Sequence, residues 1–183
     1  MVILVLNCGS SSIKYQVLDV EATAHKLLAK GIVDRIGLPE GDLVHKPVGK
    51  ENFHLHQPIA DHTTGISLVL EALTDKEHGV IASLDEVKAV GHRVAHGGEF
   101  FADSAVVTEE AKEKIRSLFA IAPLHNPANL EGILSIEKVL PSVPQVAVFD
   151  TSFHQSIPAR NYLYALPMEY YDKYRVRRYG FHG

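Results

Sequence analysis

The order of secondary-structure patterns along the chain is the feature that most constrains its fold. Residues 2–57 carry strand-type patterns separated by turn residues, whereas helix-type and strand-type patterns alternate over residues 61–149. This order favours an α/β domain built on a mixed β-sheet that is flanked by helices. Because 183 residues with 46% hydrophobic content suffice for one sizeable core, we expect one domain over residues 1–183.

The first third of the chain predicts two hairpins. Residues 2–6 and 13–19 are β-rich and flank a small polar loop, and residues 27–36 predict a third strand. Residues 43–57 alternate polar and apolar side chains around a Gly-Lys turn, which predicts the second hairpin. We expect this second hairpin to be exposed and peripheral, because it carries several polar and basic residues: His45, Lys46, Lys50, His54 and His56.

Three helices and two further strands are predicted in the remainder. Asp61 precedes a run with apolar residues at helical spacing, as an N-cap does, and Thr108 begins a second, amphipathic helix. Asn126 followed by proline predicts another helix, with the asparagine as its cap. Residues 87–90 and 144–149 are apolar runs, and the second is continuous enough to predict a central strand buried on both faces.

Composition limits the classes of partner. The formal charge is −4, with 18 basic and 22 acidic residues mixed along the chain, so we expect small-molecule partners and no nucleic acid. The apolar start is too short for a membrane span or a signal peptide, so no membrane association is expected. Cys8 is the one cysteine, which excludes an intramolecular disulfide and fits a cytoplasmic protein.

The polar loop after the first strand is a candidate phosphate site. Gly9 is followed by Ser10, Ser11 and Ser12, so backbone N–H groups and hydroxyls gather in one turn, and Lys14 lies just beyond it. The alternative is a plain solvated hairpin turn. The motif alone does not decide between them.

Arg93 is a candidate ligand for an anion. It follows an apolar strand and lies between glycines, and a guanidinium can donate two parallel hydrogen bonds to a carboxylate or phosphate. A structural ion pair is the alternative. His92 and His96 have the spacing of a helical zinc pair, but the neighbouring glycines argue against a helix and we assign no metal to them.

Two further polar residues stand where α/β sheets place ligand contacts. Asp150 ends the second apolar strand, although a turn or helix cap is an alternative role for it. His182 lies between glycines, which would let an imidazole approach a ligand closely, and the alternative is an ordinary loop histidine.

Five segments together resemble the acetate kinase family. They are residues 6–14 (LNCGSSSIK), 91–93 (GHR), 123–127 (PLHNP), 149–151 (FDT) and 178–183 (RYGFHG), in the family's order. The resemblance spans the whole chain and implies the actin-like ATPase (ribonuclease H-like) fold, in which two similar domains close over the nucleotide. Residues 1–183 would be the N-terminal domain, and the second domain is expected to be absent from this chain.

The resemblance also implies roles for individual residues. Phosphate contacts would come from Asn7, Ser10, Ser12 and Lys14, with Asn7 also helping to hold Mg²⁺ or Mn²⁺. The catalytic residues would be Arg93, Asp150 and His182. The substrate would be bound by Arg93, with a pocket for its methyl group lined by Ala95, Leu124 and Phe181.

Asp150 is not needed as a base for the substrate. Family accounts give it proton transfer, but a carboxylic acid substrate with a pKa of about 4 is already ionised at neutral pH. We therefore expect Asp150 to position Mg²⁺ or its waters, or to orient Arg93.

The implied activity is reversible transfer of the ATP γ-phosphoryl group to acetate, giving acetyl phosphate and ADP. Many family members carry valine where this chain has Ala95, so the extra room makes propionate the alternative substrate. A non-catalytic actin-like binding domain is the alternative of a different class. The full-length protein is expected to be a homodimer, and this chain alone is expected not to turn over.

Overall fold

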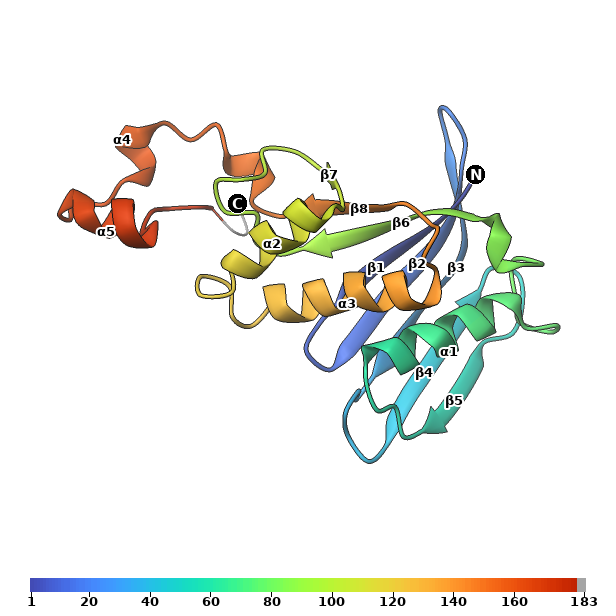
Figure 1. Cartoon of the computed structure of the whole chain (residues 1–183). Coiled ribbons are helices and arrows are strands. Elements are labelled where there is room, and N and C mark those ends of the chain that lie inside the picture. Colours follow the sequence, from blue (N-terminus) through green and yellow to red (C-terminus); the bar gives the residue numbers. More distant parts are fainter. Residues whose placement is uncertain (181–183) are drawn as a thin grey trace.

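One mixed sheet of eight strands organises residues 1–180, which are the residues that this computed structural model describes (Figure 1). In chain order the strands are β1 (Val2–Cys8), β2 (Ser12–Val20), β3 (His25–Asp34), β4 (Gly41–Pro47), β5 (Phe53–Gln57), β6 (Val87–Val94), β7 (Ala105–Val106) and β8 (Gln145–Phe149). Their order across the sheet is β5-β4-β3-β2-β1-β6-β8-β7. β1, β6 and β8 run parallel, so their carboxyl ends lie together at one end of the sheet. Phe181 and His182 lie outside the described residues.

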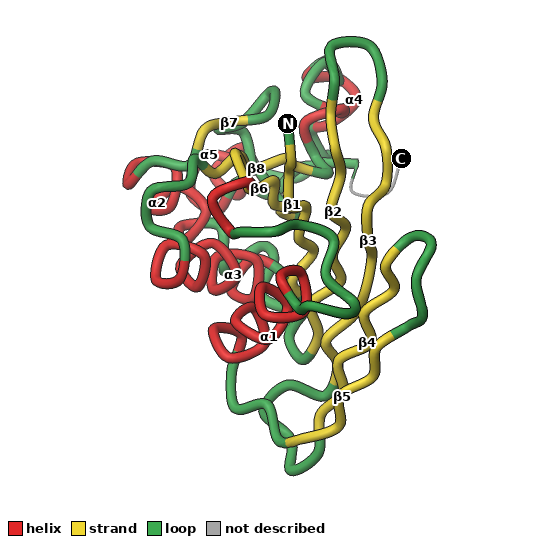
Figure 2. Tube along the Cα trace, turned by 90° about the vertical axis from the view of Figure 1, so that its right-hand side faces the viewer, coloured by secondary structure: helices red, strands yellow, loops and turns green. Residues whose placement is uncertain are grey.

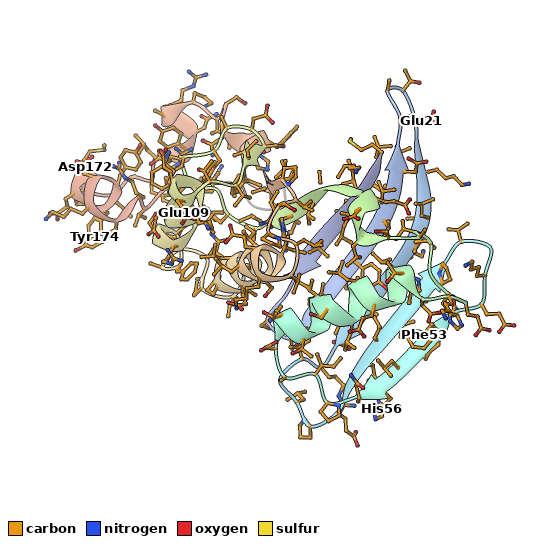
Figure 3. All side chains as sticks on the ribbon, turned by 45° about the vertical axis from the view of Figure 1, so that its right-hand side comes forward. Glu21, Phe53, His56, Glu109, Asp172 and Tyr174 are labelled. Carbon is orange, nitrogen blue, oxygen red and sulfur yellow. The ribbon has the colours of Figure 1, made fainter. Side chains whose placement is uncertain are left out.

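The longer helices cover one face of this sheet. The α-helices are α1 (His62–Thr74), α2 (Glu109–Ser117), α3 (Asn126–Val139), α4 (Ala159–Tyr162) and α5 (Met168–Tyr174). In Figure 2, α1, α2 and α3 lie on the same side of the strands, and Figure 3 shows Asp172 and Tyr174 of α5 at the outer end of a segment that extends away from the sheet. No helix in residues 1–180 has the length and apolar character needed to cross a membrane. The predicted α/β architecture is confirmed.

Helix α3 joins the two halves of the hydrophobic core. Ile136 packs in the larger cluster, beneath α1 and strands β1 to β4, whereas Leu130 and Ile133 pack in the second cluster with Phe149. All four side chains are buried. Since α3 contributes to both clusters and packs against β1 and β6, it links the two halves of the core to the parallel strands.

Of the two predicted helix caps, Asp61 is confirmed and Asn126 is wrong, whereas Thr108, predicted to begin a helix, is the cap of α2. The Asp61 carboxylate accepts a hydrogen bond from the Thr64 N–H at 2.7 Å, and Thr108 Oγ1 accepts from the Ala111 N–H at 3.2 Å. Asn126, by contrast, is the first residue of α3, and its amide turns inward to the backbone of residue 96 instead of capping the helix. The buried backbone N–H and carbonyl of His96 need hydrogen-bond partners, and Asn126 supplies both of them instead of capping the helix.

Strand β8 differs from its prediction as a central strand buried on both faces. It lies one strand from the sheet edge, beside the two-residue β7, which is too short to leave a sequence pattern. Ala147 is completely buried, whereas Val148, which points to the opposite face, is 49% exposed. Within the described residues the helices cover one face of β8, and its apolar residues on the other face are open.

The second hairpin is peripheral as predicted, except for His45. Figure 3 shows Phe53 and His56 on β5, at the edge of the sheet. His45 is completely buried: its Nε2 donates to the His78 carbonyl at 3.2 Å, so its Nδ1 accepts from the Tyr15 hydroxyl at 2.7 Å. Burial lowers the pKa of His45, which favours the neutral ring.

Gly31 provides the space through which Tyr15 reaches His45. A Cβ at this position would lie 2.3 Å from the Val44 carbonyl oxygen and 2.5 Å from the Tyr15 ring. We expect Gly31→Ala to lower the free energy of unfolding by about 1–3 kcal/mol, because strand backbone cannot yield as a flexible side chain does. Urea denaturation measures this. Gly91→Ala is the matched control, since the nearest atom there is 3.9 Å away, and an equal loss in both variants would contradict the steric explanation.

Candidate active site

Three predicted site residues lie where the parallel strands end. Asn7 is on β1, Arg93 on the neighbouring β6, and Asp150 directly follows β8 on the other side of β6. Asn7 and Arg93 also line a cavity of about 570 Å³ on the open face of the sheet, together with Lys14 of β2. The topology therefore brings together polar groups from three segments that are far apart in the sequence.

Arg93 and Asp150 form a forked ion pair. Arg93 Nε donates to Asp150 Oδ2 at 3.0 Å and Nη2 donates to the same oxygen at 2.5 Å, with a longer bond of 3.2 Å from Nε to Oδ1. The two side chains are 30% and 25% exposed, so the pair is partly open to solvent and is not sealed in the core. Within the described residues Nη1 has no protein partner, which leaves its two N–H groups available to an anionic ligand.

The Gly-Ser loop is fixed from beneath and open above. His62 Nε2 donates to the Gly9 carbonyl at 2.7 Å, and the Gly9 N–H donates to the Ser12 carbonyl at 2.8 Å. In a trans peptide the carbonyl and the following N–H point in opposite directions, so the N–H of Ser10 is directed away from His62. Ser10 and Ser11 are exposed, and their hydroxyls have no partner within residues 1–180. The loop thus presents donors outward, as a phosphate cradle requires.

The loop after β6, residues 95–98, is held by three buried side chains, a role that the sequence analysis assigned to none of them. The bonds are Ala95 N–H to Asn129 Oδ1 at 2.9 Å, His96 N–H to Asn126 Oδ1 at 3.1 Å, and Gly97 N–H to Thr151 Oγ1 at 2.9 Å. The available signal was the pair of asparagines three residues apart in the first turn of α3, which share a helix face.

The two histidines of this region are accounted for by protein partners. His92 Nε2 donates to Gln145 Oε1 at 2.7 Å, and burial lowers the pKa of His92 to about 4. His96 Nδ1 accepts from the Gly98 N–H at 3.0 Å, and burial lowers its pKa also. Among residues 1–180 no three His, Cys, Asp or Glu side chains are grouped to hold a metal ion.

Glu99 ties the C-terminal segment to this loop. It accepts from Arg177 Nη1 at 2.6 Å and from the Tyr171 hydroxyl at 2.8 Å. Arg177 in turn lies over the ring of Tyr162, at 3.6 Å from its centroid, and the rings of Tyr179 and His96 meet edge to face. The end of the described chain therefore lies beside the loop that follows β6.

The predicted methyl pocket is not assembled within the described residues. Ala95 is completely buried, Leu124 is 78% exposed, and neither lines the cavity that Arg93 and Asn7 share. Phe181 lies outside the described residues. The assignment of these three residues to a substrate pocket stays a prediction.

The strand order, the helices on one face and the loop after the first strand define an actin-like ATPase domain. The chain belongs to the acetokinase family, which it matches over residues 2–183. The acetate kinase of Caldanaerobacter subterraneus subsp. tengcongensis is 53% identical over 183 residues, which is 100% of this chain and 45% of that protein. The acetate kinase of Heliobacterium modesticaldum is 55% identical over 100% of this chain and 46% of its own length.

Solved structures agree with this assignment. A crystal structure of Porphyromonas gingivalis acetate kinase is 46% identical with a TM-score of 0.93, and one of a propionate kinase from Francisella tularensis is 36% identical with a TM-score of 0.89. Each similarity covers 100% of this chain and 45% of the other chain. The chain thus spans a little under half the length of the relatives it matches.

Proposed function

We propose that this chain supplies the phosphate-binding and carboxylate-binding part of an acetate kinase, which transfers the γ-phosphoryl group of ATP reversibly to acetate. The observation that carries the proposal is the forked pair of Arg93 and Asp150 beside the Gly-Ser loop, in a chain of the acetokinase family. ADP and acetyl phosphate would be the products. A cytoplasmic homodimer for the full-length protein belongs to the same proposal.

The chemistry follows from where donors are held. Phosphoryl transfer spreads negative charge over three equatorial oxygens, so fixed donors aimed at them stabilise the transition state more than the ground state. Arg93 would direct its free N–H groups to the acetate carboxylate or to the transferring group. Asn7, Ser10, Ser12 and Lys14 would hold the phosphates, and His182 would add a donor at the transition state.

The oxygen donors at the strand ends fit a magnesium ion. Mg²⁺ in nucleotide sites is held by one or two protein oxygens together with phosphates and water. The Asn7 amide and the Asp150 carboxylate, at the ends of β1 and β8, offer oxygen ligands of this kind. A bound Mg²⁺ would neutralise charge on the phosphates, and Mn²⁺ accepts the same ligands.

Asp150 acts in this proposal by orienting Arg93, because the acetate carboxylate is already ionised and needs no base. We expect Asp150→Asn to lower turnover about tenfold, since an amide NH₂ group facing the guanidinium would break the fork. The variant is assayed in the product of the whole gene, with Mg²⁺ titrated. Turnover and Mg²⁺ dependence both near wild type would contradict this role.

The function itself is tested by a hydroxamate assay for acyl phosphate. The product of the whole gene and this chain are each given Mg-ATP with acetate or propionate. We expect the whole product to prefer acetate and this chain alone not to turn over. A preference for propionate would make the protein a propionate kinase, and activity with neither acid would favour a non-catalytic binding domain.

A further inference from the structure

Asn129 on α3 contacts the backbones that follow two different strands. Its Nδ2 donates to the Cys8 carbonyl at 2.7 Å, at the end of β1, and its Oδ1 accepts from the Ala95 N–H at 2.9 Å, just beyond β6. The residue is 2% exposed, and both polar groups of its amide are thus satisfied by backbone. One side chain bridges the start of the Gly-Ser loop and the loop after β6, two segments more than 80 residues apart in the sequence.

The contact extends to the end of the third parallel strand. Because the Ala95 N–H points towards Asn129, the carbonyl of Val94 in the same peptide points the opposite way. That carbonyl accepts the N–H of Asp150 at 3.1 Å. Asp150 then holds Arg93 through the forked pair. Asn129 therefore stands at one end of a continuous series of bonds that reaches both charged residues of the site.

The neighbouring amide provides a contrast within the same helix turn. Asn126 is also buried, and its Oδ1 and Nδ2 both bond to the backbone of His96, at 3.1 Å and 2.9 Å. Asn126 therefore fixes only the loop after β6. The two asparagines have the same chemistry and burial, but Asn129 connects two loops whereas Asn126 serves one.

We propose that Asn129 is a positioning residue that couples the phosphate loop, residues 9–12, to the loop after Arg93, residues 95–98. Ordering of one loop by a ligand then orders the other, so phosphate binding prepares the arginine for the acceptor. A carbonyl and an N–H can be bridged this way by an amide and not by a carboxylate, because a carboxylate has no donor for Cys8. This inference rests on the proposed function where it names phosphate as the ligand.

Amide hydrogen exchange in the product of the whole gene, with no acceptor acid present, tests the coupling without any turnover. In the ligand-free protein we expect Asn129→Asp to speed exchange about tenfold at 9–12, which is the loss of about one hydrogen bond, because the carboxylate still accepts from the Ala95 N–H but has no donor for the Cys8 carbonyl. Asn126→Asp should speed exchange at 95–98 and leave 9–12 unchanged. Exchange across α1 as in wild type shows that the fold is retained, and Asn129→Gln is the second variant if Asn129→Asp does not fold. An unchanged loop 9–12 in a folded Asn129 variant would overturn the proposal.

Mg-ATP supplies the second arm of the experiment. In wild type, saturating Mg-ATP should slow exchange in both loops, whereas in Asn129→Asp it should slow exchange at 9–12 alone. Protection of 95–98 in that variant equal to wild type would overturn the coupling. If Mg-ATP protects neither loop in wild type, the phosphate role of the loop fails, while the ligand-free comparison still decides whether Asn129 couples the two loops.

Discussion

Arg93→Lys is expected to lower acyl phosphate formation by about 100-fold in the product of the whole gene, the loss typical when one fixed transition-state donor is removed. Lysine keeps the positive charge but cannot hold Asp150 with two parallel bonds and still present N–H groups to a ligand. Arg93 does both, because Nε and Nη2 face the carboxylate while Nη1 has no partner within the described residues. The hydroxamate assay at saturating Mg-ATP measures the effect.

The control for this prediction is a second arginine in an ion pair. Arg116 pairs with Glu113 on the exposed side of α2 and does not line the cavity, and Arg116→Lys should leave the rate unchanged. A loss in kcat with Arg93→Lys would indicate a donor used in the transition state, whereas a rise in KM with kcat intact would indicate plain substrate binding. A rate within a few-fold of wild type would contradict the role assigned to Arg93.

The sequence predicts where the site lies better than it predicts which side chains fix the loops of the site. Arg93 and Asp150 are recognisable because each lies at the end of an apolar run, and parallel strands carry such residues to one end of a sheet. Asn126 and Asn129 bond to backbone about 30 or more residues away, and local patterns contain no such distance. From local pattern alone, Asn-Pro therefore predicts a helix cap. The prediction is wrong because the Asn126 amide bonds to the backbone of His96 in a buried loop.

In the fold, too, features that depend on neighbouring residues are predictable from the sequence, whereas features that depend on contacts between distant residues are not. The strand and helix order follows from periodicity, and caps such as Asp61 follow from local chemistry. Periodicity cannot tell which face of an apolar strand is covered, so Val148 is exposed on a strand predicted to be buried on both sides. Nor can it predict that Gly31 on β3 leaves room for Tyr15 of β2 to reach His45 of β4, which buries a histidine expected at the surface.

Acidification is expected to destabilise the chain through its buried histidines. Burial lowers the pKa of His92 from 6.5 to about 4, so between these values the unfolded chain takes up a proton that the folded chain does not. A group with a lowered pKa contributes stability that is complete above the ordinary value and is lost as the pH falls from about 6.5 to about 4. For His92 the loss approaches ~3 kcal/mol. His45 and His96, whose pKa values are also lowered by burial, add to it in the same direction.

Urea denaturation at several pH values between 7 and 4 measures this loss, and His92→Gln isolates the contribution of His92. Glutamine does not titrate, and its amide can still donate to Gln145, so the variant should lose less stability per pH unit than wild type. His25→Gln, at an exposed histidine on β3, is the matched control and should keep the wild-type slope. Equal slopes in wild type and His92→Gln would mean that His92 is not held neutral by burial, and that the acid sensitivity of the fold arises elsewhere.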